Sequence, residues 1–237
     1  MIAEVGAGYY NGHYFDPGLV EPTQPRTSGY RRYGHSLTAD TRFFLSAGHS
    51  VLEALGPIAA VGKLHVVDLG GAKGMMASAL RWWLPQSQIY NLDISTYATQ
   101  NALPEVRPRT TQADVKTLPF PANSFDLLLC LDVLEHLPEI HVSQTLDEIY
   151  RVLKPKGKAV LAPCAPLEDK FNRLDKSHVC IKPFSWWAEK IQASGLVLQE
   201  KSTIKLARRL SNCGLWQFYF PTLRPLLFIA LKPKQNR

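Results

Sequence analysis

The segment from Lys63 to Leu80, which reads KLHVVDLGGAKGMMASAL, constrains the fold more than any other part of this chain. A short apolar run containing Val66 and Val67 ends in Asp68, and a glycine-rich turn follows before a helix-prone stretch. This order predicts a buried strand, a tight turn and a helix, with small residues where a ligand could approach the backbone. By itself the segment indicates a nucleotide-like ligand at the turn between a strand and a helix.

Strand and helix patterns alternate from this segment to the end of the chain. The helical patterns carry apolar residues three and four positions apart, as at Leu146, Ile149 and Leu153. Nearly continuous apolar runs such as 125–131 indicate strands that are buried on both faces, as in a parallel sheet covered by helices. The expected strands are 64–69, 87–92, 108–112, 125–131, 157–163, 196–203 and 225–232, and the expected helices are 37–56, 74–83, 95–102, 142–153 and 183–194. The sequence therefore predicts an α/β fold, a doubly wound and mostly parallel seven-stranded sheet of the Rossmann-like type with helices on both faces.

Acidic residues stand at the ends of the first three expected strands: Asp68, Asp93 and Asp114. Parallel strands place their carboxyl ends at one edge of the sheet, where α/β folds bind their ligands. The carboxylate after the second strand can accept hydrogen bonds from a ribose diol, and the one after the third can accept a bond from an exocyclic amine. The alternative, that such acids only cap helices or form turns, explains a single case better than three in succession.

The segment at the end of the fourth expected strand, LDVLEHLP at 131–138, helps to decide which kind of nucleotide cofactor the chain binds. A nicotinamide dehydrogenase has no use for this dense group of two acids and a histidine. In combination with the earlier motifs, the chain resembles the class I S-adenosylmethionine-dependent methyltransferases of the type 11 subgroup. VVDLGGAKG is similar to the first family motif, LDIS to the second, ADVKTLPFPANSFDLLLCLDVLEHL to the third and fourth, and RVLKPKGKAVLAPC to the stretch after them. The resemblance covers residues 60–165, and a looser one continues in DKSHVCIKPFSWWAEKIQASGL, which is similar to some members that act on small molecules or saccharides.

The resemblance implies S-adenosyl-L-methionine as the cofactor and methyl transfer as the reaction. The motif positions that it implies for cofactor binding are Asp68, Gly70, Gly71, Gly74, Asp93, Ile94, Asp114, Val115 and Leu131. The chain departs from the family pattern at Ala72, where the family has a glycine, and at Lys73, where it has Ser or Thr. Alanine leaves the turn passable if its φ stays negative. Lys73 either pairs with the carboxylate of the cofactor or points into solvent.

Two histidines are predicted to be catalytic. Methyl transfer to an oxygen or a carbon acid needs a base near neutral pH, and histidine is the natural candidate. His136 follows the fourth expected strand, and His178 follows the fifth, in the sequence DKSH with Asp175 as a substrate-binding or orienting residue. An alternative role for His136 is to cap or pack the turn that follows it. No metal site is expected, because the four cysteines lack the paired spacing of zinc ligands.

The N-terminal part of the chain is predicted to be a lid. Residues 1–57 form an arm and a helix in this interpretation, and residues 58–237 form the methyltransferase domain. The arm is rich in aromatic residues, unlike a disordered tail, and three of its tyrosines are predicted to bind the substrate: Tyr14, Tyr30 and Tyr33. A closing lid would exclude water from a cationic methyl donor.

Composition limits the partners and the location of the protein. The net charge of +7 is spread along the chain, so it indicates a basic surface rather than a nucleic-acid site, and nucleic acid stays an unfavoured partner. The N-terminus lacks the pattern of a signal peptide, and the apolar stretch near the C-terminus is interrupted by prolines and an arginine, so we expect no membrane span and a cytoplasmic location.

The expected function is methyl transfer to a small-molecule acceptor, at an oxygen in the first place and otherwise at a nitrogen or a carbon. The alternatives are an RNA or protein methyltransferase and a non-catalytic binding subunit that retains the fold. The sequence leaves the acceptor and the oligomeric state open.

Overall fold

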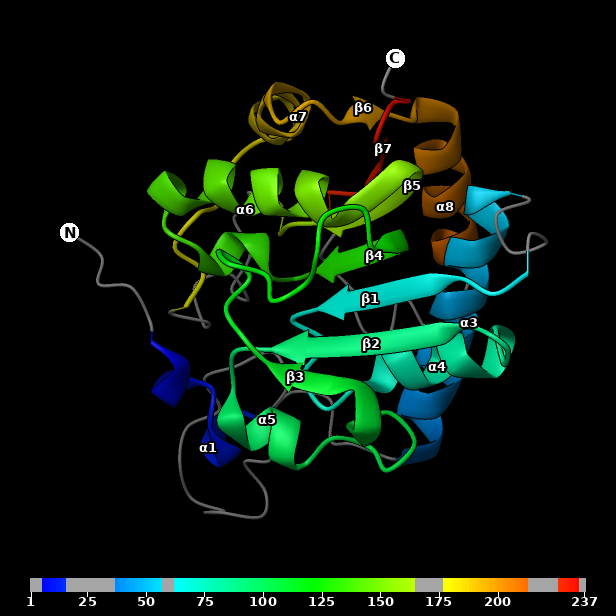
Figure 1. Cartoon of the computed structure of the whole chain (residues 1–237), viewed down its shortest axis with the longest axis vertical. Coiled ribbons are helices and arrows are strands. Elements are labelled where there is room, and N and C mark those ends of the chain that lie inside the picture. The colour runs from blue at the N-terminus through cyan, green and yellow to red at the C-terminus, as the bar shows by residue number, and fades with distance from the viewer. Residues whose placement is uncertain (1–5, 16–36, 57–61, 165–176, 213–225, 235–237) are drawn as a thin grey trace.

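A mixed seven-stranded sheet forms the centre of the protein (Figure 1). The computed structural model describes residues 6–15, 37–56, 62–164, 177–212 and 226–234. The strand order in these residues is β3-β2-β1-β4-β5-β7-β6. The strands are β1 (His65–Leu69), β2 (Gln88–Asp93), β3 (Thr110–Gln112), β4 (Phe125–Leu131), β5 (Leu153–Ala162), β6 (Val197–Leu198) and β7 (Phe228–Leu231). Strands β1 to β5 pair in parallel, and β7 runs antiparallel to both β5 and β6.

Helices cover both faces of the sheet. One face packs against α3 (Leu37–Leu55), α4 (Met75–Trp83) and α8 (Glu200–Asn212). The other face packs against α6 (Glu139–Val152) and α7 (Phe184–Ala193). The short helices are α1 (Gly12–Phe15) and α5 (Thr96–Gln100), with 3-10 turns η1 (Ala7–Tyr9), η4 (Arg107–Arg109) and η5 (Leu134–His136). Because α3 shares one apolar core with α4 and α8, it is an integral layer of the domain.

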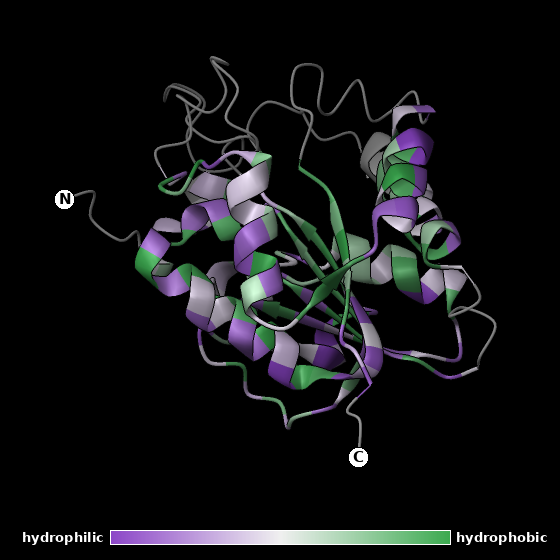
Figure 2. Cartoon of the chain, turned by 90° about the horizontal axis from the view of Figure 1, so that it is seen from above, coloured by the Kyte–Doolittle hydropathy of each residue, from purple (hydrophilic) through white to green (hydrophobic). Residues whose placement is uncertain are grey.

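The central strands are apolar on both faces because each face has its own core. Leu127 and Leu129 of β4 enter the core under α3, α4 and α8, whereas Leu128 and Cys130 enter the core under α6 and α7. All four side chains are fully buried. Figure 2 shows the apolar strands enclosed by helices whose outer faces are hydrophilic. Burial on two sides explains the uninterrupted apolar run that predicted this strand.

The predicted fold class is confirmed, with two corrections to the elements. The expected strand 196–203 is wrong after Leu198, because α8 begins at Glu200 and buries Leu206 and Leu210, one helical turn apart, against α3. The fifth strand begins at Leu153 and not at 157, and its pairing register with β4 shifts between Phe125 and Leu127. Among the helices in the described ranges, none combines the length and the apolarity that a membrane crossing requires.

Candidate functional site

The site is built around the glycine turn after β1. Gly70 and Gly74 have φ values of 68° and 86°, in the left-handed region that glycine adopts without strain. The backbone N–H groups of Gly70 and Gly71 donate to the carbonyl of Leu92, at 2.7 and 3.1 Å. These bonds tie the turn to the carboxyl end of β2. The first and second motifs of the sequence therefore meet at one point.

Ala72 is also in the left-handed region, with a φ of 50°, so the condition of a negative φ, under which alanine was expected to leave the turn passable, is not met. This conformation costs a non-glycine residue roughly 1–2 kcal/mol. Two side chains of β2 compensate for it. Asp93 Oδ2 accepts a hydrogen bond of 2.8 Å from the Ala72 N–H, and Asn91 Nδ2 donates a bond of 3.1 Å to the Ala72 carbonyl. The unusual turn is thus held on both of its backbone polar atoms.

Asp93 stands where the turn, β2 and the pocket meet. Its second oxygen, Oδ1, accepts a hydrogen bond of 2.8 Å from the backbone N–H of Ser95. Burial raises the pKa of this carboxyl, and the backbone N–H groups of Ser95, Ala72 and Ile94 oppose that rise. Each carboxylate oxygen can accept a further hydrogen bond. Asp93 therefore fits the predicted role of binding a ribose diol.

Asp68 and Asn91 lie beneath the turn with acceptors that no group in the described residues satisfies. Oδ2 of Asp68 and Oδ1 of Asn91 are both buried, and neither has a hydrogen-bond partner. A Cβ atom at Gly71 would lie within 2.5 Å of both oxygens. Glycine at this position therefore leaves open the space next to the two oxygens. Burial, with the nearby charge of Asp93, raises the pKa of Asp68 to about 7. A ligand N–H or ammonium group over Gly71 would complete this cradle, so the turn fits the amino group of S-adenosylmethionine.

The raised pKa of Asp68 makes the stability of the ligand-free protein fall as pH increases. The unfolded chain releases this proton near its ordinary pKa of 3.8, and the folded chain retains it up to about 7. Between about pH 5.5 and pH 8 we therefore expect Asp68 to lower the free energy of unfolding by about 2 kcal/mol. Urea unfolding at the two pH values measures this, with Asp68→Asn as the variant that lacks the dependence. Equal pH dependence in both proteins would contradict the assignment.

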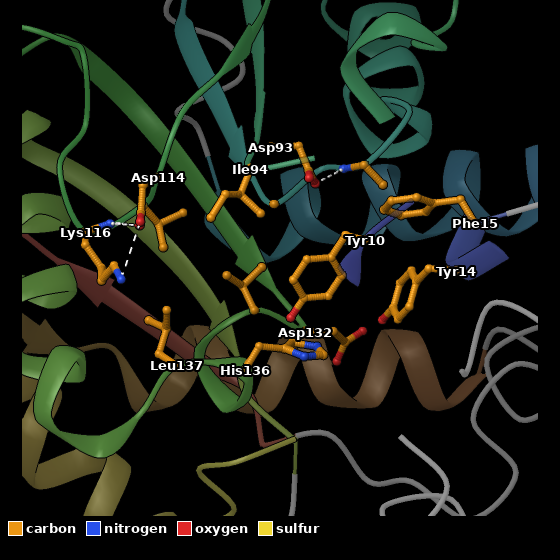
Figure 3. Close-up of a pocket in the computed structure, with 14 residues that line it drawn as sticks. Tyr10, Tyr14, Phe15, Asp93, Ile94, Asp114, Lys116, Asp132, His136 and Leu137 are labelled. Atoms are coloured by element: carbon orange, nitrogen blue, oxygen red, sulfur yellow. Dashed lines mark hydrogen bonds and ion pairs between the residues drawn. The ribbon is translucent and has the colours of Figure 1, made fainter. Parts of the chain in front are cut away.

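A pocket opens at the carboxyl edge of the sheet, between the N-terminal arm and the loops after β1 to β4 (Figure 3). Asp93 and Ile94 form one side, and Asp114 lies beside them. Tyr10 and Tyr14 of the arm lie beside His136, and the rings of Tyr10 and His136 contact each other edge to face with centroids 5.8 Å apart. The residues that line it are Tyr10, Tyr14, Phe15, Gly70, Ala72, Asp93, Ile94, Asp114, Val115, Lys116, Asp132, Val133, His136 and Leu137.

The arm is attached to this edge of the sheet by packing and by a hydrogen bond. Phe15 is buried against Ala72 and Ala98, and its ring stacks on that of Tyr97 with centroids 6.4 Å apart. The hydroxyl of Ser95 donates a hydrogen bond to the carbonyl of Tyr10. The described part of the arm therefore covers the glycine turn and walls the pocket.

The structure brings together most of the predicted site residues in the described ranges. Five of the predicted cofactor residues line the pocket: Gly70, Asp93, Ile94, Asp114 and Val115. Asp68, Gly71 and Gly74 belong to the strand and turn beneath them. Leu131 does not line the pocket and packs toward the core under α3 and α4, because the residues that follow it, Asp132 and Val133, take that place. The predicted substrate residues Tyr30, Tyr33 and Asp175 lie outside the described residues.

The two predicted catalytic histidines are neighbours in space. His136 lines the pocket, and its ring centroid lies 4.7 Å from that of His178. Lys73 does not contribute to the lining. The catalytic role of either histidine stays a prediction.

Several pocket residues were missed by the sequence interpretation. Lys116 donates its backbone N–H to Asp114 at 2.9 Å, and its ammonium group lies 3.5 Å from the same carboxylate. Asp132 has a φ of 52°, which turns the chain sharply at the end of β4. Its position as the first acid of LDVLEHL was the signal that could have identified it. Phe15 and Leu137 had no such signal, since apolar residues in loops are common.

The fold and the pocket define a Rossmann-like domain with a pocket at the carboxyl edge of its sheet, which is where α/β folds of this kind bind nucleotide-containing ligands. Residues 67–161 match the family model described as "Methyltransferase domain". A curated relative, the uncharacterized methyltransferase YcgJ of Bacillus subtilis, is 33% identical over 153 residues, which are 57% of this chain and 58% of the relative. The malonyl-[acyl-carrier protein] O-methyltransferase of Halorhodospira halophila is 30% identical over 123 residues, 49% of this chain and 40% of the relative.

Solved structures show the same fold. The crystal structure of YcgJ has a TM-score of 0.55 at 20% identity, covering 77% of this chain and 99% of that one. Phosphoethanolamine N-methyltransferase 2 of Haemonchus contortus, solved in complex with S-adenosyl-L-methionine, has a TM-score of 0.59 at 20% identity, covering 79% of this chain and 52% of that one. The chain spans less than two thirds of the length of the curated relatives named above. Residues 67–161 are therefore similar to methyltransferase domains, as the resemblance of the sequence motifs implied.

Proposed function

We propose that this protein transfers a methyl group from S-adenosylmethionine to an oxygen of a small-molecule acceptor. The observation that carries the proposal is the composition of the pocket. Cofactor-binding residues such as Asp93 share it with Tyr10, Tyr14 and His136, which lie on its other side. A wall built by the arm of the same chain favours an acceptor small enough to enter beside the cofactor.

The cofactor-binding side has a group for each part of the ligand. In the proposed arrangement Asp93 accepts hydrogen bonds from the ribose, and Asp114 accepts one from the adenine amine. Ile94 and Val115 cover the faces of the adenine ring, and Asp68 receives the amino group over Gly71. When bound, the cofactor supplies an electrophilic methyl group on a sulfonium, so alignment and exclusion of water are what the protein must provide.

The arm provides the exclusion of water in this proposal. Tyr10 and Tyr14 contact each other edge to face, with ring centroids 5.1 Å apart, and Tyr10 makes a similar contact with His136 at 5.8 Å. In the proposed arrangement these rings cover the part of the pocket that the acceptor enters. An aromatic cover removes water from a cationic methyl donor and leaves polar ring edges to orient the acceptor.

An oxygen acceptor is supported by one of the relatives, whose name describes an O-methyltransferase. A cytoplasmic location belongs to the same proposal. It is supported by Cys130 and Cys180, which are buried thiols, as expected of a protein in a reducing compartment.

The proposal predicts that the protein methylates small acceptors and that this methylation persists as the salt concentration increases. The purified chain is incubated with methyl-labelled S-adenosylmethionine and separate pools of carboxylic acids, phenols, alcohols and amines, and products are identified by mass spectrometry. We expect label in an oxygen-containing pool, and less of it with Asp93→Ala. Bulk tRNA and total protein serve as competing acceptors. Label only in these, lost as salt increases, would favour the RNA or protein alternative, and absence of cofactor binding in calorimetry would favour a non-catalytic subunit.

A further inference from the structure

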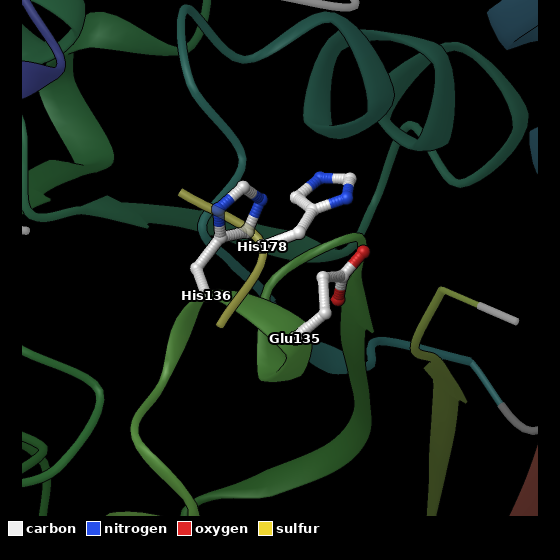
Figure 4. Close-up of side chains that lie close together, drawn as sticks. All are labelled: Glu135, His136 and His178. Carbon is white, nitrogen blue, oxygen red and sulfur yellow. The ribbon is translucent and has the colours of Figure 1, made fainter. Parts of the chain in front are cut away.

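Three side chains with metal-binding atoms lie together beside the pocket: Glu135, His136 and His178 (Figure 4). One ligand atom from each, a carboxylate oxygen or an imidazole nitrogen, lies within 4.8 Å of the others. Glu135 and His136 belong to η5, and His178 comes from a segment more than forty positions later in the chain. The cluster therefore exists only in the folded protein.

Backbone and side-chain hydrogen bonds hold the two segments against each other. The carbonyl of Glu135 accepts bonds of 2.9 Å from the backbone N–H groups of both Val179 and Cys180. Nδ1 of His136 and Oγ of Ser177 share a hydrogen bond of 2.8 Å. A bond to a ring nitrogen fixes the plane of an imidazole, as it does for histidines that bind metals. These bonds preorganise the cluster.

The surroundings of the cluster favour a cation. Glu135 is fully buried, and a buried carboxylate requires a compensating positive charge. Asp132, three positions before Glu135, lines the same pocket as His136 and brings a second carboxyl group to this part of the site. A divalent cation would offset more of this charge than one protonated imidazole.

We propose that Glu135, His136 and His178 bind a divalent transition-metal ion, with Zn²⁺ as the representative ligand. Two imidazoles and one carboxylate are the ligand set of zinc sites that keep a position open for water or substrate. Nitrogen and oxygen ligands bind zinc at about 2.0–2.2 Å. The distances between the three ligand atoms therefore need to shorten by roughly 1 Å when the ion binds.

The site has a consequence for the acceptor that rests on the proposed function. His136 also lines the pocket, so the open position of the metal would lie at the pocket wall. There it would bind and orient an acceptor oxygen. In this arrangement the two histidines are metal ligands, which replaces the prediction that either acts as the base. It also revises the expectation of no metal site, which rested on cysteine spacing alone.

Metal binding is tested on the full chain without cofactor or acceptor, so the result is independent of methyl transfer. The chelator-treated protein is titrated with Zn²⁺ by calorimetry and with Co²⁺ by absorption spectroscopy. We expect about one equivalent to bind, and we expect Glu135→Gln and His178→Gln each to weaken binding by more than about tenfold. His141→Gln on α6, a histidine outside the cluster, is the matched control and should bind like the unmodified chain.

Circular dichroism verifies that each variant is folded. If neither cluster variant folds, the Co²⁺ spectrum of the unmodified chain decides the question. A spectrum of nitrogen and oxygen ligands supports the site, and a thiolate charge-transfer band assigns the metal to cysteine and overturns it. Undiminished binding in both folded variants, or no binding by the unmodified chain, also overturns the proposal.

Discussion

Replacing Gly71 by alanine is expected to disrupt the glycine turn and abolish cofactor binding. The added Cβ would lie 2.1 Å from Oδ1 of Asn91 and 2.5 Å from Oδ2 of Asp68. Neither neighbour can move freely, because Asn91 is bonded to the carbonyl of Ala72 and Asp68 is part of the central strand β1. Overpacking at such a site costs about 3 kcal/mol of folding stability. The cradle for the amino group of the cofactor is filled by the same methyl group.

Gly48→Ala is the matched control for this substitution. Gly48 lies inside α3, and a Cβ there would meet Ala79 Cβ at 3.6 Å, an ordinary van der Waals contact. We expect this change to stabilise the protein by roughly 0.5–1 kcal/mol, because alanine suits a helix interior better than glycine. Urea unfolding and calorimetry with S-adenosylmethionine measure both effects. A Gly71→Ala protein that binds the cofactor as tightly as the Gly48→Ala protein would falsify the proposal that the amino group of the cofactor binds over Gly71.

Replacing Asp93 by alanine is expected to weaken cofactor binding by about 1–3 kcal/mol, which is roughly five- to 150-fold in affinity. The carboxylate has two tasks. It is proposed to bind the ribose, and it accepts bonds from the backbone N–H groups of Ala72 and Ser95 that shape the pocket edge. Its removal should therefore also lower the free energy of unfolding, since the left-handed Ala72 loses a compensating bond.

Asp126→Ala separates the loss of stability from the loss of binding. Asp126 accepts a bond of 2.9 Å from the backbone N–H of His65 and one of 2.7 Å from Lys154 Nζ, at the opposite edge of the sheet from the pocket. We expect it to destabilise the fold without changing cofactor affinity, measured by calorimetry well below the unfolding transition. If Asp93→Ala retains full affinity, or if both variants lose it equally, Asp93 does not bind the ribose.

The fold was predictable because its signals are local. Apolar runs such as 125–131 and the stripe containing Leu146 and Ile149 depend only on residues within a few positions of each other. The helix α8 was missed for the same reason. Its buried residues Leu206 and Leu210 have the spacing of a helical face, but they stand among charged residues, and the segment before them was assigned to a strand.

The two halves of the site differ in how far sequence reasoning could reach. Asp68, Asp93 and Asp114 follow successive parallel strands, and parallel pairing obliges their ends to meet at one edge. The positive φ of Ala72 could not be predicted, because the side chains that compensate for it, those of Asn91 and Asp93, come from another strand.

The amino-acid sequence alone determined most of the sheet, the glycine turn and the acids at its carboxyl edge, because apolar periodicity and the placement of acids after successive strands are local features. The tertiary structure decided which residues line the rest of the pocket. It placed Tyr10 and Phe15 of the arm over the glycine turn and His178 beside Glu135 and His136. These contacts join segments separated by tens of residues through hydrogen bonds and packing that leave no periodic trace in the chain. For that reason the cofactor could be inferred from the sequence, whereas the acceptor side of the pocket emerges only from the folded protein.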